Sequence, residues 1–157
     1  MITSPQLLLD HGEEPNITDK RGRTALHVAS FYGQFKVVEL LLERGADIHT
    51  KDDCEYTALH EAAGAGRVEI FSLLLDRHAD PNEQKDDGWA ALHLALDRGH
   101  VQVVGVLLKG GADPLGPDQN QNVDTPFQLA SRRKHMQIMR SLSERTGEKM
   151  GGSETQG

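Results

Sequence analysis

Eight histidines are the side chains of this 157-residue chain that could most readily do chemistry, because imidazole binds metals and carries protons. His27, His60 and His93 recur every 33 residues, and His100 and His135 share a second recurring position. Residues that recur in this way belong to separate structural units, and packed helical units lie about 10 Å apart. Zinc ligands lie about 2 Å from the metal. Histidines of different units therefore cannot converge, and we expect neither a metal site nor a cofactor.

Catalytic motifs are also missing from the sequence. His60-Glu61 lacks the second histidine of a zinc metalloprotease helix, because the residue four positions after His60 is Gly64. Cys54 has acidic neighbours, which disfavour the thiolate that a catalytic cysteine needs. The stretch 113–124 faintly resembles a calcium loop, but its spacing is wrong and the closing glutamate is missing. An enlarged loop is the plainer interpretation, and we do not expect an enzyme.

Charge and composition narrow the classes of partner. The formal net charge is −7, and residues 52–97 alone carry 11 acidic and 3 basic side chains. Such a surface repels phosphate backbones, so nucleic acid is not expected as the main ligand. No apolar run reaches the roughly 18 to 20 residues of a membrane span, and we expect no signal peptide. The single cysteine fits a reducing compartment, which favours a cytoplasmic or nuclear location.

A 33-residue internal repeat organises the chain. The aligned opening segments are 19–27, 52–60 and 85–93, without a gap, and 123–130 after a two-residue insertion. The first three openings are each followed by an apolar run at 37–42, 70–75 and 103–108. These runs have the spacing of amphipathic helices. A single unit cannot bury its apolar face alone, so several units must stack.

Local signals predict two helices in each unit. In the first unit Thr24 can cap a helix through its side-chain oxygen, and we expect that helix at about residues 25–32. Gly33 supplies the stop, because glycine adopts the left-handed conformation without strain. The second helix is expected at about 35–44. Equivalent caps and stops in later units are Thr57, Gly66 and Gly99.

This pattern resembles the ankyrin repeat over roughly residues 5–145. The opening Thr-Ala-Leu-His at 24–27 and 57–60 is similar to the family's Thr-Pro-Leu-His, with alanine in place of proline. Further departures are Ala90 in place of threonine and Glu55 in place of a turn glycine. The resemblance implies an all-α fold: an ankyrin-repeat solenoid of stacked helix-turn-helix units with projecting β-hairpins. It also implies that His27, His60 and His93 are structural and tie the hairpins to the helices.

On this basis we divide the chain into a partial N-terminal repeat, three full repeats, a capping repeat and a disordered tail. Their bounds are 1–18, 19–51, 52–84, 85–117, 118–145 and 146–157. The opening unit lacks its first helix, so we expect a fragment of a longer array, or else a monomer in which something covers Leu7–Leu9. Ser141 and Ser143 replace buried leucines in the last unit, which indicates a polar cap.

Candidate binding residues follow from the resemblance, since partners of the family bind the concave side formed by hairpin tips and first-helix ends. Carried over by position, the candidates are Arg21, Arg23, Phe31, Tyr32, Asp53, Tyr56, Asp86, Asp87, Trp89, Asp97 and Arg98. Tyrosine and tryptophan are enriched at binding hot spots. The acidic neighbours favour a protein or peptide partner with basic and apolar anchor residues. Alternatively, the aromatic side chains pack against neighbouring hairpins and only stiffen the stack.

The expected function is a scaffold for protein–protein interaction through this groove, with Gly64 and Ala65 leaving room in front of exposed aromatic side chains. The alternative is an architectural segment of a longer ankyrin array, with the partner bound elsewhere. A third idea also follows from the resemblance: Asn16 or Asn82 could be hydroxylated by an asparaginyl oxygenase, which would be incidental to function.

Overall fold

Four pairs of helices make up the part of the chain that the computed structural model describes, which comprises residues 14–110, 112, 126–133 and 135–146. The helices are α2 (Ala25–Tyr32), α3 (Phe35–Glu43), α4 (Ala58–Ala65), α5 (Val68–Asp76), α6 (Ala91–Arg98), α7 (Val101–Lys109), α8 (Pro126–Arg132) and α9 (Met136–Thr146). The two helices predicted at about 25–32 and 35–44 are confirmed to within one residue.

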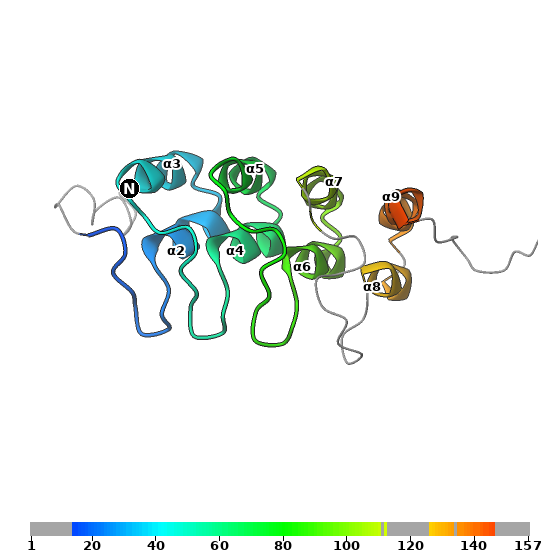
Figure 1. Ribbon diagram of the computed structural model, residues 1–157, viewed down its shortest axis with the longest axis horizontal. Helices are drawn as coiled ribbons and strands as arrows, with labels where there is room; N and C mark the ends of the chain where they lie inside the picture. Colours follow the sequence, from blue (N-terminus) through cyan, green and yellow to red (C-terminus); the bar gives the residue numbers. More distant parts are fainter. Residues whose placement is uncertain (1–13, 111, 113–125, 134, 147–157) are drawn as a thin grey trace, which may run out of the picture.

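The helices lie in two rows (Figure 1). α2, α4, α6 and α8 form the first row, in which each helix packs against the next. α3, α5, α7 and α9 form the second row, and each also packs against its own first-row partner. The pairs therefore follow one another along the stack in chain order, so contacts run mainly between neighbouring pairs.

Three segments project from the first row, away from the second (Figure 1). No described residue lies in a β-strand, so the expected projecting β-hairpins are not shown, and these segments are loops. Each loop is closed by one backbone hydrogen bond of 2.9 Å across its base, from residue 19 to 23, 52 to 56 and 85 to 89. Neighbouring loops are joined by Asp53 N–H to the Arg21 carbonyl at 2.9 Å and Asp86 N–H to the Cys54 carbonyl at 3.3 Å. Such isolated bonds do not make the repeated ladder that defines paired strands.

The predicted caps and stops are confirmed. The Thr24 and Thr57 hydroxyls accept hydrogen bonds from the backbone N–H groups of His27 and His60. The glycine stops have φ between 72° and 74°, a left-handed conformation that other residues adopt only with strain. At Gly66 space is also limited, because an added Cβ would lie 2.7 Å from His100 Nδ1. Gly66 is thus required both by its backbone conformation and by the next pair.

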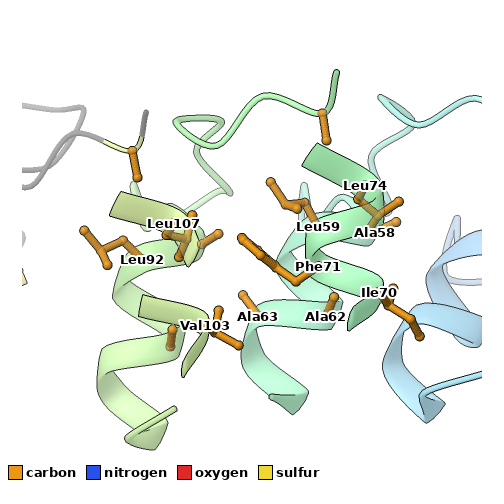
Figure 2. Close-up of a cluster of buried hydrophobic side chains, with 14 of the residues drawn as sticks. Ala58, Leu59, Ala62, Ala63, Ile70, Phe71, Leu74, Leu92, Val103 and Leu107 are labelled. Atoms are coloured by element: carbon orange, nitrogen blue, oxygen red, sulfur yellow. The ribbon is translucent and has the colours of Figure 1, made fainter. Parts of the chain in front are cut away.

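The core lies between the two rows and continues from pair to pair. Leu74 and Leu107, which belong to the apolar runs at 70–75 and 103–108, are both fully buried. Figure 2 shows Phe71 pointing from α5 towards the α6–α7 pair, and it too is fully buried. Small residues such as Ala62 and Ala63 are fully buried on α4, where they let the first-row helices approach closely. Aliphatic and alanine side chains thus fill a core that contains few aromatic residues.

Several sequence-based predictions lie outside the described residues. They are Leu7–Leu9, most of the partial first repeat, the calcium-like stretch 113–124, the tail 147–157 and the Ser141 side chain. The division into repeats at the predicted bounds stays a prediction. In the last pair, Ile138 and Met139 of α9 are buried and Ser143 is half-buried. Among the described residues, no helix is long and apolar enough to cross a membrane.

Candidate partner-binding surface

Two of the recurring histidines, His27 and His60, each join a first-row helix to the segment that follows it in the stack. His27 Nδ1 accepts a hydrogen bond from the Thr24 N–H at 3.1 Å, and its Nε2 lies 2.8 Å from the Tyr56 carbonyl oxygen. His60 repeats this arrangement between Thr57 and Glu83. Because Nδ1 accepts a bond and Nε2 faces a carbonyl, the hydrogen bonds assign the neutral tautomer that carries its proton on Nε2.

Burial keeps these imidazoles neutral. It lowers the pKa of His27, and it lowers the pKa of His60 to about 4 even though the Glu83 carbonyl acts in the opposite direction. Neutral His27 and His60 therefore position the loops near pH 7, which is the structural role that the resemblance implied. No group of three or more His, Cys, Asp or Glu side chains able to hold a metal occurs within the described ranges.

A pocket of about 230 Å³ opens where α2, α4 and the first loop meet. It is lined by Arg23, His27, Val28, Phe31, Tyr32 and Glu61, and we call it the Glu61 pocket. Three of the predicted binding residues (Arg23, Phe31 and Tyr32) therefore meet in one place. The volume is below that of sites for drug-sized ligands and suits a single inserted side chain.

Phe31 and Tyr32 form the exposed aromatic wall of this pocket. Their rings meet edge to face, with centroids 5.0 Å apart and planes at 81°. Phe31 is 41% exposed and Tyr32 is 63% exposed, so these two rings lie at the surface as predicted. Exposed aromatic rings next to a pocket can bury a large area on binding with little loss of side-chain freedom.

Glu61 is the residue of this pocket that the sequence prediction missed. The first-row positions equivalent to Glu61 hold Val28, Leu94 and Leu129, and both leucines are buried. Burial, together with the charge of Asp52, raises the pKa of the Glu61 carboxyl to about 7. A carboxylate at a position that is apolar in the other units was the signal in the sequence that could have identified it.

The two basic side chains whose charges act on Glu61 are bonded elsewhere. Arg23 Nη2 lies 2.9 Å from a carboxylate oxygen of Asp19. Arg98 Nη1 lies 3.4 Å from the Gly64 carbonyl oxygen. Both arginines lower the pKa of Glu61 through their charge. Within the described part of the chain, however, the Glu61 carboxylate has no hydrogen bond or ion pair.

Tyr56 and Trp89 differ from the exposed position that we expected. Both are half-buried: Tyr56 packs edge to face on His60 at 5.9 Å, and Trp89 stacks on His93 at 5.7 Å. Trp89 also packs against the hydrophobic core. The reason is geometric, since each loop folds back over the imidazole at the start of its own first-row helix. Both rings thus pack on the histidine of their own unit, whereas the alternative drawn from the sequence had them packing against neighbouring hairpins.

The acidic residues of the third loop are engaged by a lysine. Lys85 is only 9% exposed, and its ammonium group forms ion pairs with Asp86 and Asp87 and lies 5.0 Å from the centre of the Tyr56 ring. Asp19 and Asp52 occupy the position of Lys85 in the first and second loops, and their carboxylates accept backbone hydrogen bonds within those loops. In the third loop Asp87 accepts such a bond from the Trp89 N–H. Asp86 and Asp87 are therefore less available to a partner than we expected.

The remaining predicted residues belong to the first two loops and to the end of α6. Asp97 pairs with Arg133 of the next unit at 2.7 Å. Arg21 and Asp53 are exposed and joined through their backbones. At Gly64 an added Cβ would meet nothing within 4 Å, so the space predicted in front of α4 is present. Cys54 of the second loop is exposed.

The comparison with known families agrees with this architecture. A family model described as ankyrin repeats (3 copies) matches residues 49–118, and a second, ankyrin repeats (many copies), matches residues 8–60. Together they span residues 8–118. No curated protein matches the chain.

Proposed function

The chain belongs to the ankyrin repeat family, whose members generally act as protein-interaction modules, and on this premise we propose that it binds a protein or peptide partner. The partner contacts the loop tips and the exposed ends of the first-row helices. The observation that carries this proposal is the Glu61 pocket with its exposed Phe31 and Tyr32. Surface aromatic residues beside a pocket have the character of binding hot spots.

The same proposal includes a partner that offers basic and apolar side chains. The exposed Asp53, the half-buried Glu61 and a formal net charge of −7 favour such a partner over nucleic acid. We further propose that the chain is a binding scaffold and not an enzyme, and that it works in the cytoplasm or nucleus, where its exposed Cys54 thiol stays reduced.

A selection experiment tests the interaction. Peptides are selected from a random displayed library against the immobilised chain, and the affinity of a selected peptide is measured by calorimetry for two matched variants. Tyr32→Ala removes an aromatic side chain that is 63% exposed beside the Glu61 pocket. Met136→Ala removes an apolar side chain that is 59% exposed at the start of α9.

We expect Tyr32→Ala to weaken binding by about 30-fold or more, the effect of a lost hot spot, and Met136→Ala to leave it unchanged. Equal affinities for both variants, or failure to select any peptide, would reject this surface. That result would instead favour the alternative of an architectural segment with the partner bound elsewhere.

A further inference from the structure

We propose that the Glu61 pocket receives the side chain of an arginine of the partner, with the guanidinium paired to Glu61 and lying against Phe31 and Tyr32. This inference rests on the proposed function and specifies the chemistry of its anchor. The first observation is that no side chain of the described residues forms an ion pair with this carboxylate. Arg23, the basic residue in the pocket wall, is held by Asp19 at 2.9 Å.

Burial makes the unpaired carboxylate unfavourable in the free protein. Taking a charge from water without a partner is costly, and the raised pKa of Glu61 reflects this burial. An incoming cation offsets that penalty, whereas a neutral side chain leaves it in place. The unpaired Glu61 carboxylate thus favours a positively charged ligand group over a neutral one.

The aromatic wall favours arginine over lysine. A guanidinium is planar and weakly hydrated, stacks on aromatic faces, and can donate two parallel hydrogen bonds to one carboxylate. An ammonium is a compact and strongly hydrated charge. Phe31 and Tyr32 are exposed beside the carboxylate, and the volume of about 230 Å³ leaves space for one such group. His27 is neutral and bonded to Tyr56, so it does not compete for Glu61.

Arginine binding should depend on pH through Glu61. The titratable and charged groups that act on Glu61 are Asp52, Arg23 and Arg98, with His27 in the pocket wall. The carboxyl ionises near pH 7 in the free protein, and the guanidinium binds the ionised form. Affinity should therefore rise between pH 6 and pH 8, and binding should release protons below pH 7.

The test uses acetyl-arginine-methylamide as the probe, titrated into the full chain and followed by backbone amide chemical shifts. The lysine, dimethyl-lysine and citrulline analogues are titrated in parallel, since citrulline is a neutral near-isostere of arginine. We expect saturable shifts around residues 28–32 and 61 for arginine, weaker binding for both lysines and none for citrulline. Arginine should bind more tightly at pH 8 than at pH 6. Glu61→Gln should weaken arginine binding by about tenfold or more.

Glu43→Gln is the matched control, because Glu43 is an exposed glutamate on α3 in the other row. A thermal melt shows whether each variant is folded. Citrulline binding as tightly as arginine, preference for either lysine, or full binding by folded Glu61→Gln would each overturn the inference. A further outcome is that selected peptides lose affinity for Tyr32→Ala, contain no arginine and bind Glu61→Gln as tightly as wild type. In that case the arginine anchor is wrong and the binding surface stands. If no peptide is selected, the proposed function fails, and the titration still reports on the pocket.

Discussion

At the scale of single residues, Glu61 and His60 are neighbours in the sequence whose protonation acts on stability in opposite directions. Burial raises the pKa of Glu61 to about 7 and lowers that of His60 to about 4. Between about pH 4.5 and 6.5 the two effects oppose each other. In the wild-type chain the contributions of Glu61 and His60 to the free energy of unfolding therefore partly cancel. Variants at each residue are needed to measure them separately.

Replacing Glu61 by the leucine found at 94 and 129 should stabilise the chain above pH 7. The folded pKa of Glu61 is raised, so its contribution is fully present below about pH 4.5 and is lost as the pH rises through 7. We expect Glu61→Leu to raise the free energy of unfolding by on the order of 1 kcal/mol at pH 8, after allowing for solvent screening. The gain at pH 4.5 should be smaller. Urea unfolding at both values measures this, and a loss of stability at pH 8 would mean that the carboxylate has a favourable partner in the folded chain.

Acid should destabilise the chain through His60. Its folded pKa is lowered from 6.5 to about 4, so its contribution is fully present above pH 6.5 and is lost as the pH falls towards 4. The expected loss by pH 4 is on the order of 3 kcal/mol. His60→Gln should flatten this part of the stability profile, because glutamine does not titrate. Urea unfolding from pH 7 to 4 compares the two proteins, and parallel profiles would contradict the assignment.

At the scale of the helices, the third unit lacks one of the bonds that begin α2 and α4. The Thr24 and Thr57 hydroxyls accept from the histidine N–H, whereas Ala90 has no side-chain acceptor. His93 Nδ1 still accepts from the Ala90 N–H at 3.0 Å. We expect Ala90→Thr to stabilise the chain by about 1 kcal/mol, measured by urea unfolding. Thr57→Ala is the reciprocal control and should destabilise it by a similar amount; a destabilised Ala90→Thr would mean that the added atoms do not fit.

Trp89 of the third loop and Tyr32 of α2 contrast a structural aromatic side chain with an exposed one. Trp89 is half-buried and stacked on His93, so Trp89→Ala should lower the free energy of unfolding by about 1–3 kcal/mol, less than for a fully buried tryptophan. Tyr32→Ala should change it by less than about 0.5 kcal/mol. Urea unfolding of both variants tests this contrast. A Trp89→Ala chain as stable as wild type would contradict this structural role.

Along the whole molecule, the features predictable from the sequence were those decided within one unit. Thr24, His27 and Gly33 lie within ten residues and form or end one helix, so their spacing alone predicted it. The neighbours of Glu61 and the contact of the Lys85 ammonium with the Tyr56 ring depend on how side chains of different units are placed. A sequence pattern gives the order of such units but not which side chains bury each other's charges.

The same stacking determines how much a substitution in the core lowers the free energy of unfolding. Leu74 of α5 is fully buried, and helices on either side in its row, α3 and α7, pack against α5. The adjacent Leu73 is only half-buried. Leu74→Ala should therefore lower the free energy of unfolding by about 2–5 kcal/mol, and Leu107→Ala, which removes a fully buried side chain of α7, by a similar amount. Leu73→Ala is a matched control of the same chemistry and should lower it by less.

The denaturant dependence of unfolding distinguishes a local loss from a break in the stack. In a linear stack, stability is roughly the sum of unit and neighbour-interface terms. If the interfaces remain strong, the pairs unfold together and the slope with urea is the same as in wild type. We expect Leu74→Ala to shift the midpoint and keep this slope, because α4 still packs against α2 and α6 through the first row. A reduced slope would contradict this. If amide exchange of α2 and α3 were also slower than that of α6 and α7, the chain would divide at α5 into parts that unfold separately.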